Sequence, residues 1–328
     1  MALVHVGCAD RRDTVVSIAI HPKKSNILYI ATDESVYKTR DGGQSWIRLD
    51  EGLDRVRVTT VLVDPHLPAN VLAGTMGDGV YMSPDGGHRW FSRNTGIQKG
   101  TISVNVQQLV LHPRNSQILY AATTVGVFQS TNGGAQWVER MQGMTEINFI
   151  VSLAVDPTRT NIVYAGTSGG VYRSMDATEH WEKVNTGLVP PDAKMASMAL
   201  GVNILVIDPV TPDTVYAATT RGVFKTINRG ETWKGLGTVG SKGYVSSMAI
   251  DPRNPNILYI ATAEGVQKSV DGGNTWVFMN KGLDNINIRA IRLHPQDDHV
   301  LYIGTNGGGA YHSANGGMDW SKIPIHAD

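Results

Sequence analysis

The stretch Ser269-Val-Asp-Gly-Gly-Asn-Thr-Trp276 recurs in altered form along the whole chain and decides the fold. Every copy ends on a tryptophan, with an aspartate or asparagine five residues before it. The seven pairs are Asp41 and Trp46, Asp85 and Trp90, Asn132 and Trp137, Asp176 and Trp181, Asn228 and Trp233, Asp271 and Trp276, and Asn315 and Trp320. Successive tryptophans stand 43 to 52 residues apart, which indicates seven repeats of one structural unit.

Each repeat has the pattern of four short β-strands. In the first repeat, Val15–Ile20 is mostly apolar on both faces, and His21-Pro22 ends it because proline cannot continue a central strand. Residues 27–31 and 35–39 supply the next two strands, and the fourth surrounds Trp46. Regular short strands in a repeat of this length are typical of a β-propeller.

We therefore predict an all-β, seven-bladed β-propeller with four antiparallel strands per blade. The acid- or amide-containing turn connects the third strand of each blade to the fourth. Residues 1–13 form an N-terminal extension and residues 14–328 a single propeller. The blades span approximately residues 14–54, 55–101, 102–146, 147–200, 201–241, 242–285 and 286–325. Whether residues 2–7 pair with the last blade is left open.

The repeated acids, amides and tryptophans are expected to be structural. A side-chain oxygen of aspartate or asparagine accepts hydrogen bonds from backbone N–H groups of its own turn, and the following glycine supplies a left-handed backbone conformation. The tryptophan then buries the turn. Seven equivalent turns around a ring lie too far apart to cooperate in catalysis. The fourth copy departs from the pattern, with Thr178 in the glycine position.

The pattern Ser/Thr-x-Asp-x-Gly-x-Thr-Trp resembles the Asp-box (BNR) repeat, and the resemblance covers residues 14–325. Asp-box propellers include sialidases, xyloglucan-cleaving glycosidases, sortilin-type receptors and photosystem II assembly-factor-like proteins. In length and single-ring layout the chain looks most like the last group, which is non-catalytic. It departs from that group in having no evident arginine-rich surface. The resemblance implies a protein that assembles or links a larger complex, such as a respiratory or photosynthetic enzyme.

Charge and composition exclude several classes of function. Lysine plus arginine and aspartate plus glutamate each number 29 in 328 residues, so no basic surface for nucleic acid is expected. Cys8 is the one cysteine, so no intramolecular disulfide forms. No segment has the length of apolar sequence that spans a bilayer, and the N-terminus does not resemble a signal peptide. We expect a soluble protein that is either cytoplasmic or exported after removal of a leader.

A catalytic or metal site is not expected. Sialidase-like relatives carry an arginine motif early in the first blade, whereas residues 14–20 contain no arginine. A glycosidase needs two carboxylates about 5–10 Å apart. Asp54, Glu146 and Asp284 could meet on the face of the fourth-to-first-strand loops, but a chance gathering of acids on such a face is common. The histidines are dispersed without metal-ligand spacing. We therefore expect no enzyme, no cofactor and no metal.

Two adjacent fourth-to-first-strand loops are unusually apolar. Methionine-rich apolar surfaces adapt to protein partners. The candidate partner-binding residues are Met141, Met144, Phe149, Val189, Pro190, Pro191, Met195 and Met198. The alternative is that these methionines fold inward and plug the ring.

The inner strand of the last blade carries two arginines where the other blades are mostly apolar. Arg289 and Arg292 are expected near the central channel, where they could clamp an anion or carboxylate. The alternative is an ion pair or backbone contact that closes the seam with the first blade.

Taken together, the sequence favours a non-catalytic protein-binding propeller, with self-association also open. The alternative is a glycan-binding or glycan-hydrolysing propeller, which would need exposed tyrosines such as Tyr244 and Tyr311.

Overall fold

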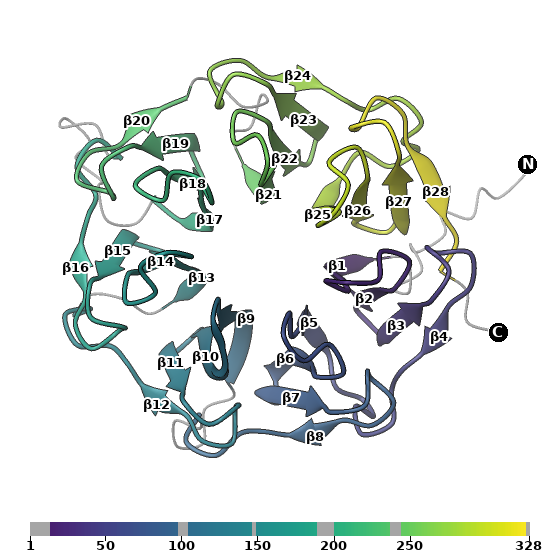
Figure 1. Cartoon of the computed structure of the whole chain (residues 1–328), viewed down its shortest axis with the longest axis horizontal. Coiled ribbons are helices and arrows are strands. Elements are labelled where there is room, and N and C mark those ends of the chain that lie inside the picture. Colours follow the sequence, from purple (N-terminus) through teal and green to yellow (C-terminus); the bar gives the residue numbers. More distant parts are fainter. Residues whose placement is uncertain (1–13, 98–103, 146–148, 189–199, 237–243, 326–328) are drawn as a thin grey trace, which may run out of the picture.

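A computed structural model describes residues 14–97, 104–145, 149–188, 200–236 and 244–325. These residues form 28 β-strands and no helix. Antiparallel sheets stand like blades around a central channel, with the first strand of each blade nearest the channel (Figure 1). The chain is therefore an all-β propeller.

Each blade contributes one strand at each of four radial positions. The innermost strands are β1 (Val15–Ile20), β5 (Val58–Val63), β9 (Val104–His112), β13 (Ile150–Val155), β17 (Val202–Ile207), β21 (Val245–Ile250) and β25 (Ile288–Leu293). The second strands are β2 (Leu28–Thr32), β6 (Val71–Gly77), β10 (Asn115–Thr123), β14 (Val163–Thr167), β18 (Val215–Thr219), β22 (Leu258–Thr262) and β26 (Leu301–Thr305). The third strands are β3 (Val36–Thr39), β7 (Val80–Ser83), β11 (Gly126–Ser130), β15 (Gly170–Ser174), β19 (Gly222–Thr226), β23 (Gly265–Ser269) and β27 (Ala310–Ser313). The outer strands are β4 (Ile47–Arg48), β8 (Phe91–Ser92), β12 (Val138–Glu139), β16 (Glu182–Lys183), β20 (Lys234–Gly235), β24 (Val277–Phe278) and β28 (Ser321–Ile323).

Strand pairing is antiparallel within each set of four consecutive strands. Five sets form separate four-stranded sheets. The sets β5–β8 and β9–β12 are joined into one eight-stranded sheet, because the end of β6 pairs with the start of β9 at Met76 opposite Asn105 and Gly77 opposite Val104.

The hydrophobic core lies between the faces of neighbouring sheets. One cluster, for example, brings Ile18 and Tyr37 of the first sheet against Tyr302 and Ile323 of the last. The first and last sheets therefore pack face to face, which closes the ring. The inner strands are apolar on both faces because each is covered by a neighbouring sheet on either side.

Antiparallel order gives the ring two distinct faces. On one, which we call the proline face, the His-Pro and Asp-Pro turns meet the acid- or amide-containing turns: Gly42 N–H donates to the Asn26 carbonyl, and Gly272 N–H to that of Asn256. On the opposite face, which we call the entry face, the inner strands begin beside the turns between second and third strands.

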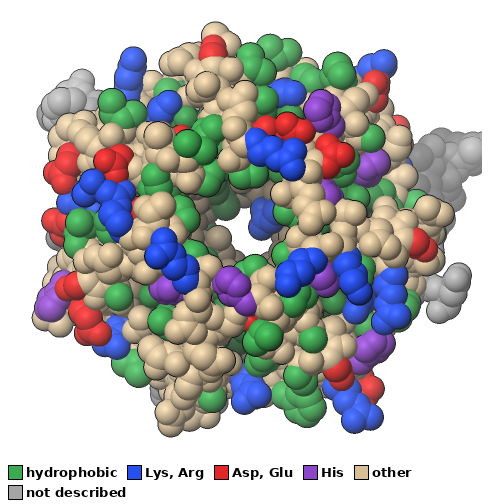
Figure 2. Space-filling view, in the orientation of Figure 1, with side chains coloured by type: hydrophobic (Ala, Val, Ile, Leu, Met, Phe, Trp, Pro, Cys, Tyr) green, Lys and Arg blue, Asp and Glu red, His purple; other side chains and the backbone are tan. Residues whose placement is uncertain are grey.

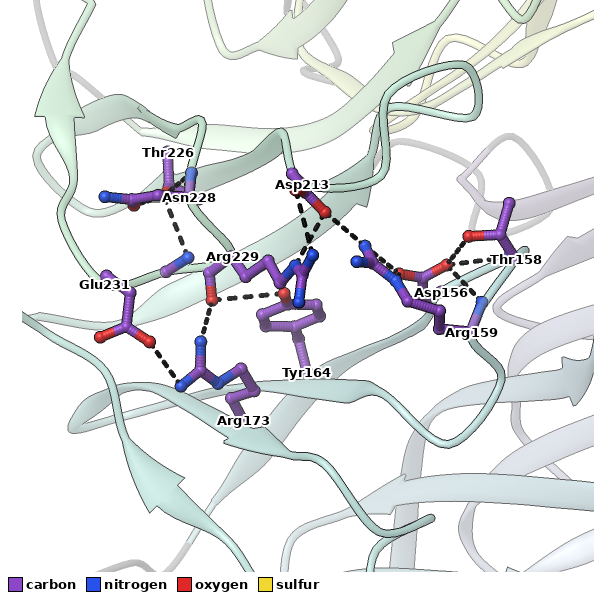
Figure 3. Close-up of polar contacts among 11 residues, drawn as sticks. Asp156, Thr158, Arg159, Tyr164, Arg173, Asp213, Thr226, Asn228, Arg229 and Glu231 are labelled. Carbon is purple, nitrogen blue, oxygen red and sulfur yellow. Dashed lines mark hydrogen bonds and ion pairs between the residues drawn. The ribbon is translucent and has the colours of Figure 1, made fainter.

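Side chains also tie neighbouring inner strands together. Ser17 Oγ accepts the Val61 N–H at 3.2 Å, and Ser152 Oγ accepts the Leu205 N–H at 3.1 Å, in each case from the next blade. At the seam between β13–β16 and β17–β20, charged groups add a second set of contacts (Figure 3). These contacts hold the ring rigid around the channel.

Candidate protein-binding face

The seven acid- or amide-containing turns share one hydrogen-bonding scheme. In the first, the Thr39 hydroxyl donates to Asp41 Oδ1 and accepts the Gly43 N–H, while Asp41 Oδ1 also accepts the Ser45 N–H. The corresponding hydroxyl-to-oxygen bonds end on Asp85, Asn132, Asp176, Asn228, Asp271 and Asn315. At Asp271, the hydrogen bond from the Thr275 backbone N–H, followed by those from the Thr275 and Ser269 hydroxyls, favours the charged carboxylate and lowers its pKa to about 2.

The tryptophans of these turns pack between blades. Trp46, Trp90, Trp137, Trp181, Trp233 and Trp320 are buried, whereas Trp276 is partly exposed. Four indoles also donate to a backbone carbonyl of the preceding blade: Trp137 to Arg93, Trp181 to Arg140, Trp233 to Val184 and Trp320 to Met279. The tryptophan thus joins two blades in addition to covering its own turn.

The irregular turn of the fourth blade keeps the same hydrogen-bonding geometry, but its backbone is strained. Thr178 N–H donates to Ser174 Oγ, as the glycine does elsewhere. Thr178 and Ala177 both adopt left-handed backbone conformations, with φ of 77° and 59°. Such angles strain residues that carry a Cβ atom. The departure from the repeat is therefore accommodated within the turn.

On the entry face, one repeat position forms a ring around the mouth of the channel. It lies eight residues before the proline of each blade, immediately ahead of the inner strand in six blades and at the second residue of β9 in the third. Its occupants are Thr14, Arg57, Asn105, Phe149, Gly201, Tyr244 and Asn287. In five blades its carbonyl accepts a backbone N–H near the second-to-third-strand turn, as Phe149 does from Ser168. In these five blades the same hydrogen bond holds the backbone while the side chain varies.

Large apolar side chains are exposed at this mouth. Phe149 is 51% exposed and Tyr244 is 50% exposed. Met76, at the end of β6, and Ile286, just before β25, are exposed on the same face. Exposed aromatic and methionine side chains on a rigid surface are typical of protein interfaces.

A polar cavity of about 410 Å³ lies inside the mouth. Arg289 and Tyr244 line it, together with Asn287 and Asn306. Arg57 also lines it and forms an ion pair with Asp33 at 2.9 Å. Asp33 is the one carboxylate among the described lining residues, so this cavity does not bring two carboxylates together. Of the acids that the sequence suggested could meet, Asp54 and Asp284 do not line the cavity, and Glu146 lies outside the described residues.

The structure separates the predicted partner-binding residues. Met144 is buried and Met141 packs against the same core cluster, since the chain turns inward between the third and fourth blades. Met144 therefore stabilises the interior, and Met141 is partly buried beside it. Phe149 is exposed at the mouth. Val189, Pro190, Pro191, Met195 and Met198 lie outside the described residues.

The two channel arginines do not form one clamp, because they line separate cavities. Arg292 lines a mainly apolar cavity of about 500 Å³ towards the proline face, with Ile18, Val61 and Leu111. Its Nη1 donates to the Ile291 carbonyl at 2.9 Å. The Arg292 side chain is exposed, and desolvation by the nearby protein lowers its pKa. Arg289 stands at the irregular start of β25, where the strand register shifts between Ile288 and Ala290, and Arg292 lies three residues further along the strand, towards the proline face.

Two further features bear on the predicted chemistry. Asp297, Asp298 and His299 place ligand-type atoms within 4.8 Å of one another in one turn of the last blade, a grouping the sequence pattern did not single out. Tyr311 is fully buried in the core, so it is not available for a ligand. No helix in the described part of the chain is long and apolar enough to cross a membrane.

Comparison with known proteins identifies the fold. No protein-family model matches the chain, and no curated protein matches it. Solved structures do match, and those described below share 20% sequence identity or less with this chain, so they establish the propeller fold alone. The chain superposes on a GH74 enzyme of Niastella koreensis with a TM-score of 0.71 and 20% identity, covering 92% of this chain and 52% of that one.

Two other similar structures have different contexts. YCF48 bound to D1 peptide matches with a TM-score of 0.67 and 17% identity over 93% of this chain and 94% of that one. The extracellular domain of the putative hybrid two-component system BT4673 from B. thetaiotaomicron matches with a TM-score of 0.71 and 16% identity, over 92% and 38%. This chain therefore spans about half the length of the GH74 enzyme and nearly all of YCF48.

Proposed function

We propose that this chain is a non-catalytic protein-binding propeller whose entry face docks a subunit of a larger complex, as an assembly factor or linking subunit. The observation that supports the proposal is the ring of equivalent positions at the channel mouth, where Phe149 and Tyr244 are half exposed and the Phe149 carbonyl accepts the Ser168 N–H. Rigid aromatic side chains lose little entropy on binding, and they often dominate interface energies. YCF48, a propeller of similar extent, is described with a bound peptide.

We further propose that the eight-stranded sheet counts as two blades, which makes the ring seven-bladed. Strands β5–β8 pair in sequence order, and so do strands β9–β12. Among the described residues, the two sets are joined only where the end of β6 pairs with the start of β9. The single propeller domain then runs from residue 14 onward. The repeat period in the sequence supports the same division.

A glycan-processing role has less support at this face. Tyr244 is an exposed aromatic that a sugar ring could stack on. Hydrolysis, however, needs two carboxylates on either side of the scissile bond, and Asp33, the single carboxylate lining the mouth cavity in the described residues, is paired with Arg57. The similarity to a GH74 enzyme covers half of that protein.

The test is a pair of double variants matched for exposed aromatic area. Phe149→Ser with Tyr244→Ser changes the mouth, whereas Phe91→Ser with Phe278→Ser changes the outer strands β8 and β24, where both phenylalanines are 51% exposed. A partner that copurifies stoichiometrically at high salt is first identified, then purified and titrated against each variant. We expect the dissociation constant to rise at least tenfold for the mouth variant and to stay unchanged for the outer-strand variant. The mouth variant removes two aromatic side chains that contribute about 1–2 kcal/mol each to binding.

The control outcomes separate the alternatives. Equal weakening by both double variants would show that the partner binds elsewhere on the ring. If the chain purifies alone and binds immobilised glycans in a manner that depends on Tyr244, the protein-docking proposal fails and the glycan reading replaces it.

A further inference from the structure

Basic side chains gather on the proline face over the first blade. Figure 2 shows several lysine and arginine side chains close together there, beside histidines. A cavity of about 540 Å³ lies between this blade and the next, and its basic lining residues are His21, Lys24, Lys38 and Arg40. Asp85 is the one acid among the described lining residues. The cavity is separate from the entry face and its mouth.

Lys38 is the buried member of this group. Its ammonium lies 5.0 Å from the ring centroid of Tyr29 and donates to the Gly86 carbonyl at 2.7 Å. Desolvation, followed by the charge of Arg40, lowers its pKa to about 8. The lysine is therefore mostly protonated at neutral pH, but its charge is poorly compensated.

His21 supplies a neutral donor beside these cations. Its Nδ1 accepts the backbone N–H groups of Lys23 and Lys24, each at 3.1 Å. A neutral imidazole that accepts at Nδ1 carries its proton on Nε2. Desolvation and the charge of Lys24 lower the pKa of His21, which favours this neutral form.

Asp85 does not neutralise the group. Its Oδ1 accepts the Ser83 hydroxyl and the Arg89 N–H within its own turn. In the described part of the chain, no carboxylate lies within ion-pair distance of Lys24, Lys38 or Arg40. Arg40 instead places Nη2 at 3.3 Å from Nε2 of His88. Three cations thus share a half-enclosed cavity with one carboxylate that is already engaged.

The sixth blade carries a lysine at the position of Lys38 but no arginine at the position of Arg40, so the fold does not require the Arg40 charge. Lys268 repeats the contacts of Lys38, lying over Tyr259 and donating to the Gly316 carbonyl. Desolvation lowers the pKa of Lys268 as well, and the charges of Asp251 and Asp298 oppose that shift. At Lys38 the charge of Asp85 also opposes the shift, but the charges of Arg40 and Lys24 add to it. The residue equivalent to Arg40 in that blade is Val270. The seam between the first and second blades therefore carries more positive charge around its lysine than the seam of Lys268 does.

We propose that this inter-blade cavity binds a phosphate monoester dianion, with Arg40, Lys24 and Lys38 supplying positive charge and His21 a neutral N–H donor. Cations that repel one another in a partly desolvated site are stabilised by a multivalent anion, and charge-assisted hydrogen bonds to phosphate oxygens are strong. The inference does not depend on the proposed docking of a partner at the entry face.

The test is calorimetric titration of the full chain with inorganic phosphate and phenyl phosphate, at constant ionic strength set with chloride. We expect saturable binding that weakens at least tenfold in Arg40→Ala and in Lys24→Ala. Both side chains are exposed, so these variants should keep the wild-type melting temperature. Lys268→Met is the matched control for Lys38→Met, because it removes the same lysine–tyrosine contact at a seam that contains acids, and it should leave phosphate affinity unchanged.

Three results would overturn the proposal: no binding above that of chloride, equal weakening by Lys268→Met and Lys38→Met, or unchanged affinity in Arg40→Ala and Lys24→Ala. A phosphoserine peptide serves as a second arm to identify the source of the phosphate group. Tighter binding of the peptide than of phenyl phosphate would indicate a phosphorylated protein, whereas equal binding would indicate a small phosphate ester.

Discussion

Single residues at the end of each repeat determine how tightly one blade fits the next. A glycine follows the outer strand in five blades and lies against the backbone of the next tryptophan, as Gly187 does against Trp233. A Cβ atom at Gly187 would lie 2.1 Å from the Trp233 carbonyl oxygen, and its φ of +89° is left-handed. The Trp233 N–H donates to the Thr186 carbonyl just beside it. The missing side chain is what allows two backbones to approach and bond.

Gly187→Ala is therefore expected to destabilise the protein. The added methyl group must displace backbone atoms and the alanine must adopt a strained φ, which together cost about 3 kcal/mol. Chemical denaturation measures this loss. Gly169→Ala in the same blade is the control, since its Cβ would meet its nearest atom at 3.9 Å, and its stability should stay close to that of the wild type. Similar losses in both variants would contradict the explanation.

At the scale of elements, seams between sheets combine apolar packing with local polar contacts. Between β13–β16 and β17–β20, Asp213 accepts hydrogen bonds from Arg229 and Arg159, and Arg159 also pairs with Asp156 (Figure 3). On the same seam, the Arg229 carbonyl accepts from Tyr164 and Arg173. The polar turns of one sheet are thus held against the next sheet.

The Asp213 contacts predict a pH-dependent stability. The hydrogen bonds from Arg229 and then Arg159 lower the pKa of Asp213 to about 2. Because the folded-state pKa lies below the unfolded one, this contribution is present above about pH 4 and is lost as the pH falls towards 2. Asp213 is half exposed, so the contribution at pH 7 should not exceed about 1 kcal/mol.

Comparison of wild type with Asp213→Asn in denaturation curves at several pH values checks this expectation. The wild type should be more stable at pH 7, and the difference should shrink steadily as the pH falls below about 4. A difference that stays constant between neutral and acidic pH would mean that the carboxylate charge does not matter at this seam.

At the scale of the whole molecule, the ring keeps its two candidate binding regions apart. The mouth lies on the entry face, and the basic cavity lies on the proline face between the first two blades. No described residue lines both cavities. Distant sites without shared contacts behave additively.

We accordingly expect the two regions to act independently. Arg40→Ala should leave partner affinity within twofold of wild type, and the Phe149→Ser, Tyr244→Ser variant should leave phosphate affinity within twofold. Titration of each ligand in the presence of the other measures this directly. A coupling larger than tenfold would show that the ring transmits a change between its faces.

The local chemistry of the repeat could be predicted from the sequence because its causes are local. The hydroxyl, acid or amide, and glycine of each turn lie within five residues of one another, so their spacing alone indicates the turn. The alternation of strands with proline and glycine likewise predicts an all-β propeller, which the structure and its similar proteins confirm.

The candidate sites could not be predicted in the same way, because each depends on which residues of different repeats come together. The sequence alone determined the repeat, the strand order and the turn chemistry of this protein. Only the tertiary structure decided that Met141 and Met144 pack inside while Phe149 and Tyr244 remain exposed, and that Arg289 and Arg292 line different cavities. It also decided that Lys38 of one blade meets the backbone of Gly86 in the next. The physical reason is that burial and electrostatic environment are set across the seams, between residues that are one whole repeat apart in the chain.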